Sequence, residues 1–193
     1  MTHVALFHSA LGMRPGMHDA AARLRGQGHT VVAVDQYDGQ IFNDYGEAEA
    51  FVQQVGFPAL MQRAVDAVRG LPDGFVCVGF SNGGGMAEYV ATQRRVAGVV
   101  MCSGALPLPM IGIESWPAGV DAQIHYAIGD PRRPEGWAEA VAESVAAAGA
   151  KVDFYEYPGH GHLFTDASLP DEYDPDAADL LWQRVYAFCS QHG

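Results

Sequence analysis

The stretch FVCVGFSNGGGMAEYV, residues 75–90, runs from six mostly apolar residues into a single serine that glycines closely follow. The run at 75–80 is typical of a buried strand, and residues 83–95 have the pattern of a helix. Ser81 therefore stands where a strand passes into a helix, with Gly79 and Gly83 two positions to either side. In this G-x-S-x-G arrangement the glycines remove side chains that would collide in a sharp turn, so the serine hydroxyl is exposed above the sheet.

The remainder of the chain alternates between apolar runs and amphipathic segments. Strands are predicted at 3–8, 30–35, 75–80, 96–104, 122–129 and 152–158. Helices are predicted at 17–28, at 47–69 with a break at Gly56 and Pro58, and at 83–95, 136–150 and 175–191. Strands that are apolar on both faces and separated by helices indicate a parallel sheet with both faces covered. We expect a single α/β domain over residues 1–193, with a doubly wound, mostly parallel sheet of about six strands in the order 2-1-3-4-5-6.

Composition narrows the class of protein. The chain has 193 residues, of which 49% are hydrophobic and 18% charged, as in a compact globular domain. The 23 acidic and 11 basic residues give a net charge of −12, which argues against nucleic acids and anionic membranes as partners. No apolar run approaches the ~18 residues that span a bilayer, and the first residues lack the pattern of a signal peptide. Three scattered cysteines without zinc-site spacing predict reduced thiols in a cytoplasmic protein.

Polar side chains follow several of the predicted strands, at the edge where doubly wound sheets bind ligands. Ser81 follows the third strand, Asp130 the fifth, and His160 and His162 the sixth. A serine hydroxyl is a weak nucleophile that needs an adjacent base, and the chain order Ser, Asp, His is that of α/β-hydrolases. Asp130 would orient the histidine, although a simpler interpretation is that it only opens the turn GDPRRP. Spacing alone does not decide which histidine is the base.

Four stretches together resemble the dienelactone hydrolase family, a small lidless branch of the α/β-hydrolases. They are VALFHSALGMRPGMHDAAARLRGQGHTVVAVDQYDG at 4–39, VGFSNGGG at 78–85, YAIGDPRRP at 126–134 and YPGHGHLF at 157–164. The resemblance covers nearly the whole chain and implies a lidless α/β-hydrolase fold that needs no cofactor. The usual family motif Tyr-Pro-Gly-small-Gly-His places His162 at the catalytic position and His160 at the small one.

The chain departs from the family at two positions. Members that cleave dienelactone typically carry a cysteine nucleophile and a glutamate in the first loop that interacts with it, and these positions are Ser81 and Ser9 here. A thiol is easily ionised and oxidised, whereas a serine is uncharged at neutral pH and needs only a base. The two changes together therefore indicate a serine esterase on this scaffold.

An oxyanion hole needs two backbone N–H donors. The residue after the nucleophile, Asn82, supplies one, and the resemblance implies that Ala10 supplies the other, with Leu11 as the fallback. Arg132 and Arg133 lie near the predicted mouth, where they either bind a substrate carboxylate or remain solvated. His8 is expected to be structural. The residues expected to contact substrate are Leu11, Tyr37, His160 and Phe164.

The function expected from the sequence is hydrolysis of a small ester or lactone through an acyl-enzyme on Ser81, His162 and Asp130. The alternatives are an acyltransferase with the same triad and a non-catalytic α/β protein that binds a ligand at the serine turn. No metal is expected, since the HGH of 160–162 has no third ligand in view. We expect a monomer or homodimer. The segment 105–121 between strands four and five is too short for a large lid, which favours small acyl groups.

Overall fold

The computed structural model describes residues 1–193 and contains one six-stranded sheet. Neighbouring strands pair in parallel throughout, in the order β2-β1-β3-β4-β5-β6, which confirms the predicted topology. The strands are β1 (His3–Phe7), β2 (Thr30–Val34), β3 (Phe75–Phe80), β4 (Val96–Cys102), β5 (Asp121–Ala127) and β6 (Val152–Tyr157). The helices are α1 (Pro15–Gly26), α2 (Tyr45–Val55), α3 (Phe57–Ala67), α4 (Asn82–Gln93), α5 (Trp137–Ala147) and α6 (Pro175–Gln191), with a short 3₁₀ turn, η1 (Leu108–Ile111), between β4 and β5.

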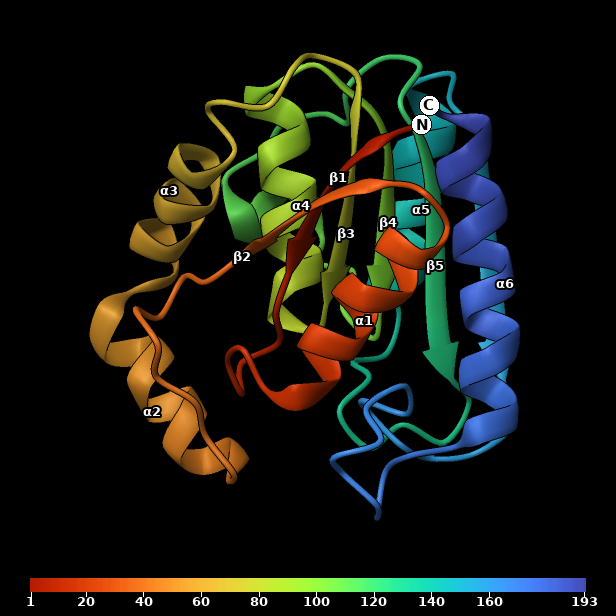
Figure 1. The fold of residues 1–193 in the computed structure, drawn as a ribbon. Coiled ribbons are helices and arrows are strands. Elements are labelled where there is room, and N and C mark those ends of the chain that lie inside the picture. The colour runs from red at the N-terminus through yellow and green to blue at the C-terminus, as the bar shows by residue number, and fades with distance from the viewer.

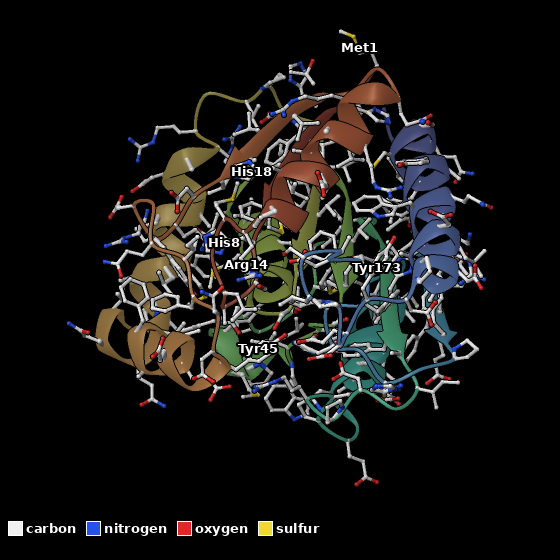
Figure 2. The ribbon with its side chains drawn as sticks, turned by 60° about the horizontal axis from the view of Figure 1, so that its bottom comes forward. Met1, His8, Arg14, His18, Tyr45 and Tyr173 are labelled. Carbon is white, nitrogen blue, oxygen red and sulfur yellow. The ribbon has the colours of Figure 1, made fainter.

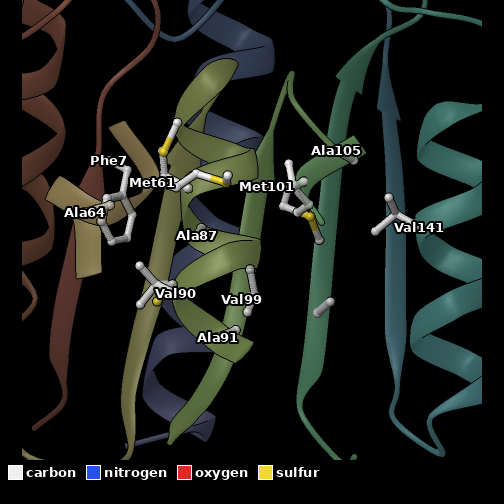
Figure 3. Packing of buried hydrophobic residues seen from close by; sticks show 14 of the residues in the cluster. Phe7, Met61, Ala64, Ala87, Val90, Ala91, Val99, Met101, Ala105 and Val141 are labelled. Carbon is white, nitrogen blue, oxygen red and sulfur yellow. The ribbon is translucent and has the colours of Figure 1, made fainter. Parts of the chain in front are cut away.

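Helices cover both faces of the sheet, so the molecule has three layers (Figure 1). In β1, Ala5 and Phe7 pack toward α3, α4 and α5, while Val4 and Leu6 pack toward α1 and α6. The same alternation recurs in β3 and β4, because successive side chains of a strand point to opposite faces. Each face of the sheet thus has its own apolar core. Figure 3 shows the core on the side of α3, α4 and α5, where Phe7 and Met101 from the sheet lie among side chains of the covering helices. The sheet is thereby held rigidly between two apolar layers.

Several element ends differ from the prediction in ways that matter for the site. β4 ends at Cys102 and not at residue 104, so Ser103 and Gly104 lie beyond the strand. The predicted break in the helical pattern over 47–69 is confirmed at Gly56, whose φ of +87° ends α2 and begins α3. α6 begins as predicted, because the Asp174 carboxylate accepts a hydrogen bond from the Ala177 N–H at 3.0 Å.

The three cysteines are free and buried, as the sequence predicts. Burial raises the pKa of each thiol, to about 12 for Cys189 and higher for Cys77 and Cys102. None of the helices combines the length and the apolar composition that crossing a bilayer requires.

Glu88 is a fully buried acidic residue on α4, the helix that begins at the serine turn. Its Oε1 accepts a hydrogen bond from the Leu106 N–H at 2.8 Å, and its Oε2 has no hydrogen-bond partner. Burial raises the pKa of this carboxyl well above the usual 4.5. The carboxyl is therefore protonated in the folded protein under conditions where the same group is ionised in the unfolded chain.

Replacing Glu88 by glutamine tests this protonation state. The folded protein holds a proton that the unfolded chain releases above about pH 4.5, so the free energy of unfolding falls as pH rises from there toward the folded pKa. Glu88→Gln keeps the acceptor for Leu106 and cannot ionise. Its stability relative to wild type should therefore increase by about 1 kcal/mol or more between about pH 5 and pH 8, measured by urea unfolding. Glu143→Gln, at an exposed position of α5, is the control. A stability difference that is the same at both pH values would contradict the prediction.

Candidate active site

The ends of three strands bring Ser81, His162 and Asp130 into one hydrogen-bonded line. The His162 ring lies 2.8 Å from the Ser81 Oγ through Nε2, and 2.7 Å from the Asp130 Oδ2 through Nδ1. Asp130 has a fully buried side chain, and that of His162 is 6% exposed. With Nδ1–H donating to the carboxylate, Nε2 carries a lone pair and accepts the serine hydroxyl proton.

Asp130 also stabilises the turn in which it lies. Its Oδ1 accepts a hydrogen bond from the Arg132 N–H at 2.8 Å, while Oδ2 faces His162. The turn and the contact with the histidine were separate interpretations of the sequence, and the structure contains both. The backbone bond fixes the carboxylate plane, so the second oxygen is aimed at the imidazole.

Ser81 occupies a strained turn between β3 and α4. Its φ of +51° and ψ of −119° lie outside the regions that L-residues ordinarily adopt. The turn is possible because backbone crosses backbone closely here: a side chain at Gly79 would overlap the Gly83 carbonyl, and one at Gly83 would overlap the Phe7 carbonyl. The Ser81 N–H donates to the Cys102 carbonyl at 2.8 Å, which fixes the turn against β4.

Two backbone N–H groups are available beside the serine. Asn82 is the first residue of α4, so its N–H has no acceptor within the helix, and Ala10 lies on the loop after β1. Both residues line the same cavity as Ser81. The Leu11 N–H is engaged, because it donates to the Ser9 Oγ at 3.2 Å. Ala10 is therefore better placed than Leu11 as the second donor of an oxyanion hole.

The cavity at Ser81 has a volume of about 180 Å³ and a mixed polar and apolar wall. The sequence predicted that four of its wall residues lie at the site: Ala10, Ser81, Asn82 and His162. Arg132, left open between substrate binding and solvation, also lines it. The remaining lining residues are Tyr45, Glu49, Ser103, Gly104, Ala105, Leu106, Tyr126, Pro134 and Trp137.

None of the four residues expected to contact substrate lines this cavity. Leu11 and Phe164 are buried in the core on the side of α1 and α6, and Tyr37 is buried against His8 and other aromatic rings on the opposite side. His160 is exposed and does not line the cavity. Leu11, Tyr37 and Phe164 follow strands, as the sequence predicts, but the loops turn their side chains into the core because burial of apolar surface is favourable.

Helix α2 and the loop before α6 form a polar wall next to the histidine. The Tyr45 hydroxyl donates to the Glu172 carboxylate, at 2.9 and 3.1 Å from its two oxygens, and the Leu163 N–H donates to the same group at 2.6 Å. The Tyr45 ring meets the His162 ring edge-on, with 5.9 Å between centroids. Figure 2 turns this end of the molecule forward, with Tyr45 on α2 and Tyr173 on the loop before α6. Glu172 thus ties α2 to the segment that carries His162.

Arg132 completes this wall at the mouth of the cavity. Its guanidinium lies 3.7 Å from the centroid of the Tyr45 ring and pairs with Glu49 at 2.7 Å. Arg133 points away and pairs with Glu139 and Glu156. The charge at the mouth is therefore already balanced within the protein.

Sequence reasoning missed several residues of the site. Ser103 and Gly104 were placed inside a strand, although a shorter strand would have put them among the residues that follow strand ends. Tyr126 belongs to β5, where the pattern of apolar residues gives no sign that its side chain borders a cavity. Tyr45 and Glu172 approach from distant segments, which spacing along the chain does not predict. No group of three or more His, Cys, Asp or Glu side chains is arranged to hold a metal ion.

Comparison with known proteins places the chain among hydrolases. The model of the Dienelactone hydrolase family matches residues 2–193. No curated protein matches the chain. Among solved structures, a dienelactone hydrolase-like promiscuous phosphotriesterase from metagenomic libraries is 21% identical, with a TM-score of 0.81 over 100% of this chain and 87% of that one. An esterase from Pyrobaculum calidifontis is 18% identical, with a TM-score of 0.70 over 99% of this chain and 76% of that one. The fold of this chain is accordingly that of the α/β-hydrolases.

Removing the Tyr45 hydroxyl should disturb the histidine without removing it. Tyr45→Phe keeps the ring against His162 and Arg132 but deletes the hydrogen bond to Glu172. Labelling of Ser81 by a fluorophosphonate should slow about tenfold, because a bond to an ionised group is lost and the base is held less accurately. The matched control is Tyr186→Phe on α6, whose hydroxyl makes no hydrogen bond in the protein. Equal labelling rates for the two variants would show that the bond to Glu172 does not position His162.

Proposed function

The chain belongs to the dienelactone hydrolase family, and from this premise we propose that it is a serine hydrolase that cleaves small carboxylic esters or lactones through an acyl-enzyme. The observation that carries the proposal is the pair of short contacts made by His162, at 2.8 Å from the Ser81 Oγ and 2.7 Å from Asp130. A base within hydrogen-bond reach of the nucleophile and oriented by a buried carboxylate is the arrangement that activates a hydroxyl.

Acylation follows from these positions. The Ser81 Oγ attacks the substrate carbonyl carbon as its proton passes to the His162 Nε2. Asp130 holds the other ring nitrogen and stabilises the imidazolium that forms. The carbonyl oxygen becomes an oxyanion, which accepts hydrogen bonds from the Asn82 and Ala10 N–H groups. Collapse of this tetrahedral intermediate breaks the bond to the alkoxy group, which leaves with the proton from His162.

Deacylation reverses these roles with water in place of the alcohol. His162 takes a proton from water, and the oxygen of that water attacks the acyl carbon. The second tetrahedral intermediate collapses to release the carboxylic acid, and His162 returns its proton to the Ser81 Oγ. A lactone passes through the same steps, except that the alcohol released in acylation stays attached to the acyl chain as a hydroxyl group. Hydrolysis of the bond to the Ser81 Oγ then releases a hydroxy acid.

The residue at position 9 supports serine chemistry over cysteine chemistry. Dienelactone-cleaving members carry a glutamate at this position, whereas the Ser9 Oγ here accepts the Leu11 N–H and shapes the loop that holds Ala10. An uncharged serine nucleophile has no need of a carboxylate that manages its ionisation. The side chain at position 9 therefore serves loop geometry in this chain.

Substitution of the triad tests the proposal. Ser81→Ala and His162→Ala should each lower kcat for p-nitrophenyl acetate by a factor on the order of 10⁴–10⁶, because the two residues act as one unit. The control is His160→Ala, at an exposed position outside the cavity, which should stay within about tenfold of wild type. Circular dichroism should show an unchanged fold for all three. A Ser81→Ala protein that keeps more than a tenth of wild-type turnover would exclude this serine as the nucleophile.

The size of the cavity predicts a preference for short acyl groups. Its volume of about 180 Å³ lies below the range of about 300–1,000 Å³ that is typical of ligand pockets, and only η1 stands between β4 and β5 as possible cover. Each methylene that is buried contributes about 0.8 kcal/mol, so kcat/KM should rise only while the chain fits inside. In a series of p-nitrophenyl esters from two to twelve carbons we expect the maximum at acetyl to butyryl. A maximum at eight carbons or longer would mean that a larger apolar surface binds the acyl chain.

A further inference from the structure

Three residues other than glycine have a positive φ, and only one of them lacks an explanation. They are Asp38, Ser81 and Ser103, with φ values of +54°, +51° and +54°. Asp38 lies in an exposed turn, and aspartate tolerates this conformation better than most residues. Ser81 lies at the turn that presents the proposed nucleophile. Ser103 is 5% exposed and directly follows β4.

Positions 103 and 104 differ in what they require. No side chain fits at position 104, which is glycine, whereas position 103 has a positive φ that favours glycine and is nevertheless a serine. At the next position, Gly104, a side chain would overlap the Ser81 carbonyl, so only glycine fits. Ser103 itself is fixed against β5, because its N–H donates to the His125 carbonyl at 2.7 Å. A positive φ costs an ordinary residue on the order of 1–3 kcal/mol, and glycine would avoid most of that cost. Backbone strain of this kind persists where the side chain has a use.

Ser103 lines the cavity together with Ser81 and His162. Its hydroxyl makes no hydrogen bond within the protein and is not one of the fully enclosed polar atoms, so a ligand in the cavity can reach it. Other buried or half-buried serines are engaged: the Ser9 Oγ accepts the Leu11 N–H, and the Ser144 hydroxyl donates to the Ala140 carbonyl. Gly104 packs directly against the Ser81 backbone, and Ser103 and Ser81 line the same cavity. A hydroxyl on a cavity wall that makes no hydrogen bond within the protein is a group available to a ligand.

A second hydroxyl lies on the same wall. The Tyr126 oxygen accepts the Ala105 N–H at 2.9 Å, its own proton has no acceptor in the protein, and the ring borders the cavity. Burial raises the pKa of Tyr126 to about 12, so the phenol keeps its proton at neutral pH. The wall at the ends of β4 and β5 thus presents two free O–H donors.

We propose that Ser103 and Tyr126 form a subsite for a neutral oxygen atom of the substrate, such as a hydroxyl, ether or keto oxygen close to the scissile carbonyl. This inference rests on the proposed esterase function and narrows its substrate class. Two uncharged donors match an uncharged acceptor, and the one cation at the mouth, Arg132, is already paired with Glu49. The site therefore selects oxygen-bearing acyl groups over hydrocarbon acyl groups of the same size.

The test compares p-nitrophenyl methoxyacetate with p-nitrophenyl butyrate, which differ only by an oxygen in place of a methylene. The ratio of their kcat/KM values is measured for wild type, Ser103→Ala and Ser103→Gly. Intrinsic reactivity of the two esters cancels when this ratio is compared between proteins. We expect the ratio to fall about threefold to tenfold in both variants, as for the loss of one hydrogen bond. Asp38→Gly, which relieves the same φ in an exposed turn, should leave the ratio at the wild-type value.

Thermal unfolding of the same proteins distinguishes a role of the Ser103 side chain in substrate binding from a role in stabilising the fold. Ser103→Gly should unfold at or above the wild-type midpoint, because glycine adopts the positive φ without strain. A lower midpoint would show that the side chain is retained for the fold and would overturn the inference. So would a ratio that changes by less than about twofold in an active enzyme. A protein with no turnover that depends on Ser81 would overturn the proposed function, and this inference with it.

Discussion

The close approach of backbone segments around Ser81 is the constraint on which the rest of the site depends. Gly79 and Gly83 leave no room for a side chain at the turn, and Gly104 leaves none between the end of β4 and the serine. Packing of this density forces an unusual φ and ψ on Ser81, lifts its hydroxyl above the sheet and brings the first N–H of α4 beside it. It also sets where β4 must end, and hence where Ser103 faces the cavity. A methyl group at any of these glycines would displace Ser81 and the backbone around it together.

Residues whose position follows from local pattern were predicted well. The sheet order and the approach of Ser81, Asp130 and His162 follow from buried strands, crossover helices and polar residues at strand ends, all of which are visible along the chain. Leu11 and Phe164 were misplaced because a loop's path determines whether an apolar side chain turns toward the core or toward a cavity. Glu172 was missed because its contacts to Tyr45 and Leu163 join segments that are far apart in sequence.

Two kinds of contact hold the proposed active site in place: apolar packing of the sheet and hydrogen bonds in the polar wall. Ser81 and Asp130 follow buried strands of the sheet, and the apolar packing of these strands holds both residues rigidly. His162 stands on a loop. The adjacent Leu163 N–H and the Tyr45 hydroxyl both donate hydrogen bonds to Glu172, and the Tyr45 ring packs against the His162 ring. Such bonds are directional and break more readily than a packed core, so opening of the molecule near the site would begin with α2 and the loop before α6.

The burial of all three cysteines has a consequence for how the protein withstands chemical damage. Peroxides and alkylating agents attack thiolates that solvent can reach, and here each sulfur is enclosed and holds its proton more tightly than a free thiol. With a hydroxyl as the proposed nucleophile, the reactive atom is itself not a target of oxidation. A nucleophilic thiolate is open to oxidation by peroxides, whereas the proposed serine nucleophile and the buried thiols of this chain are protected from it.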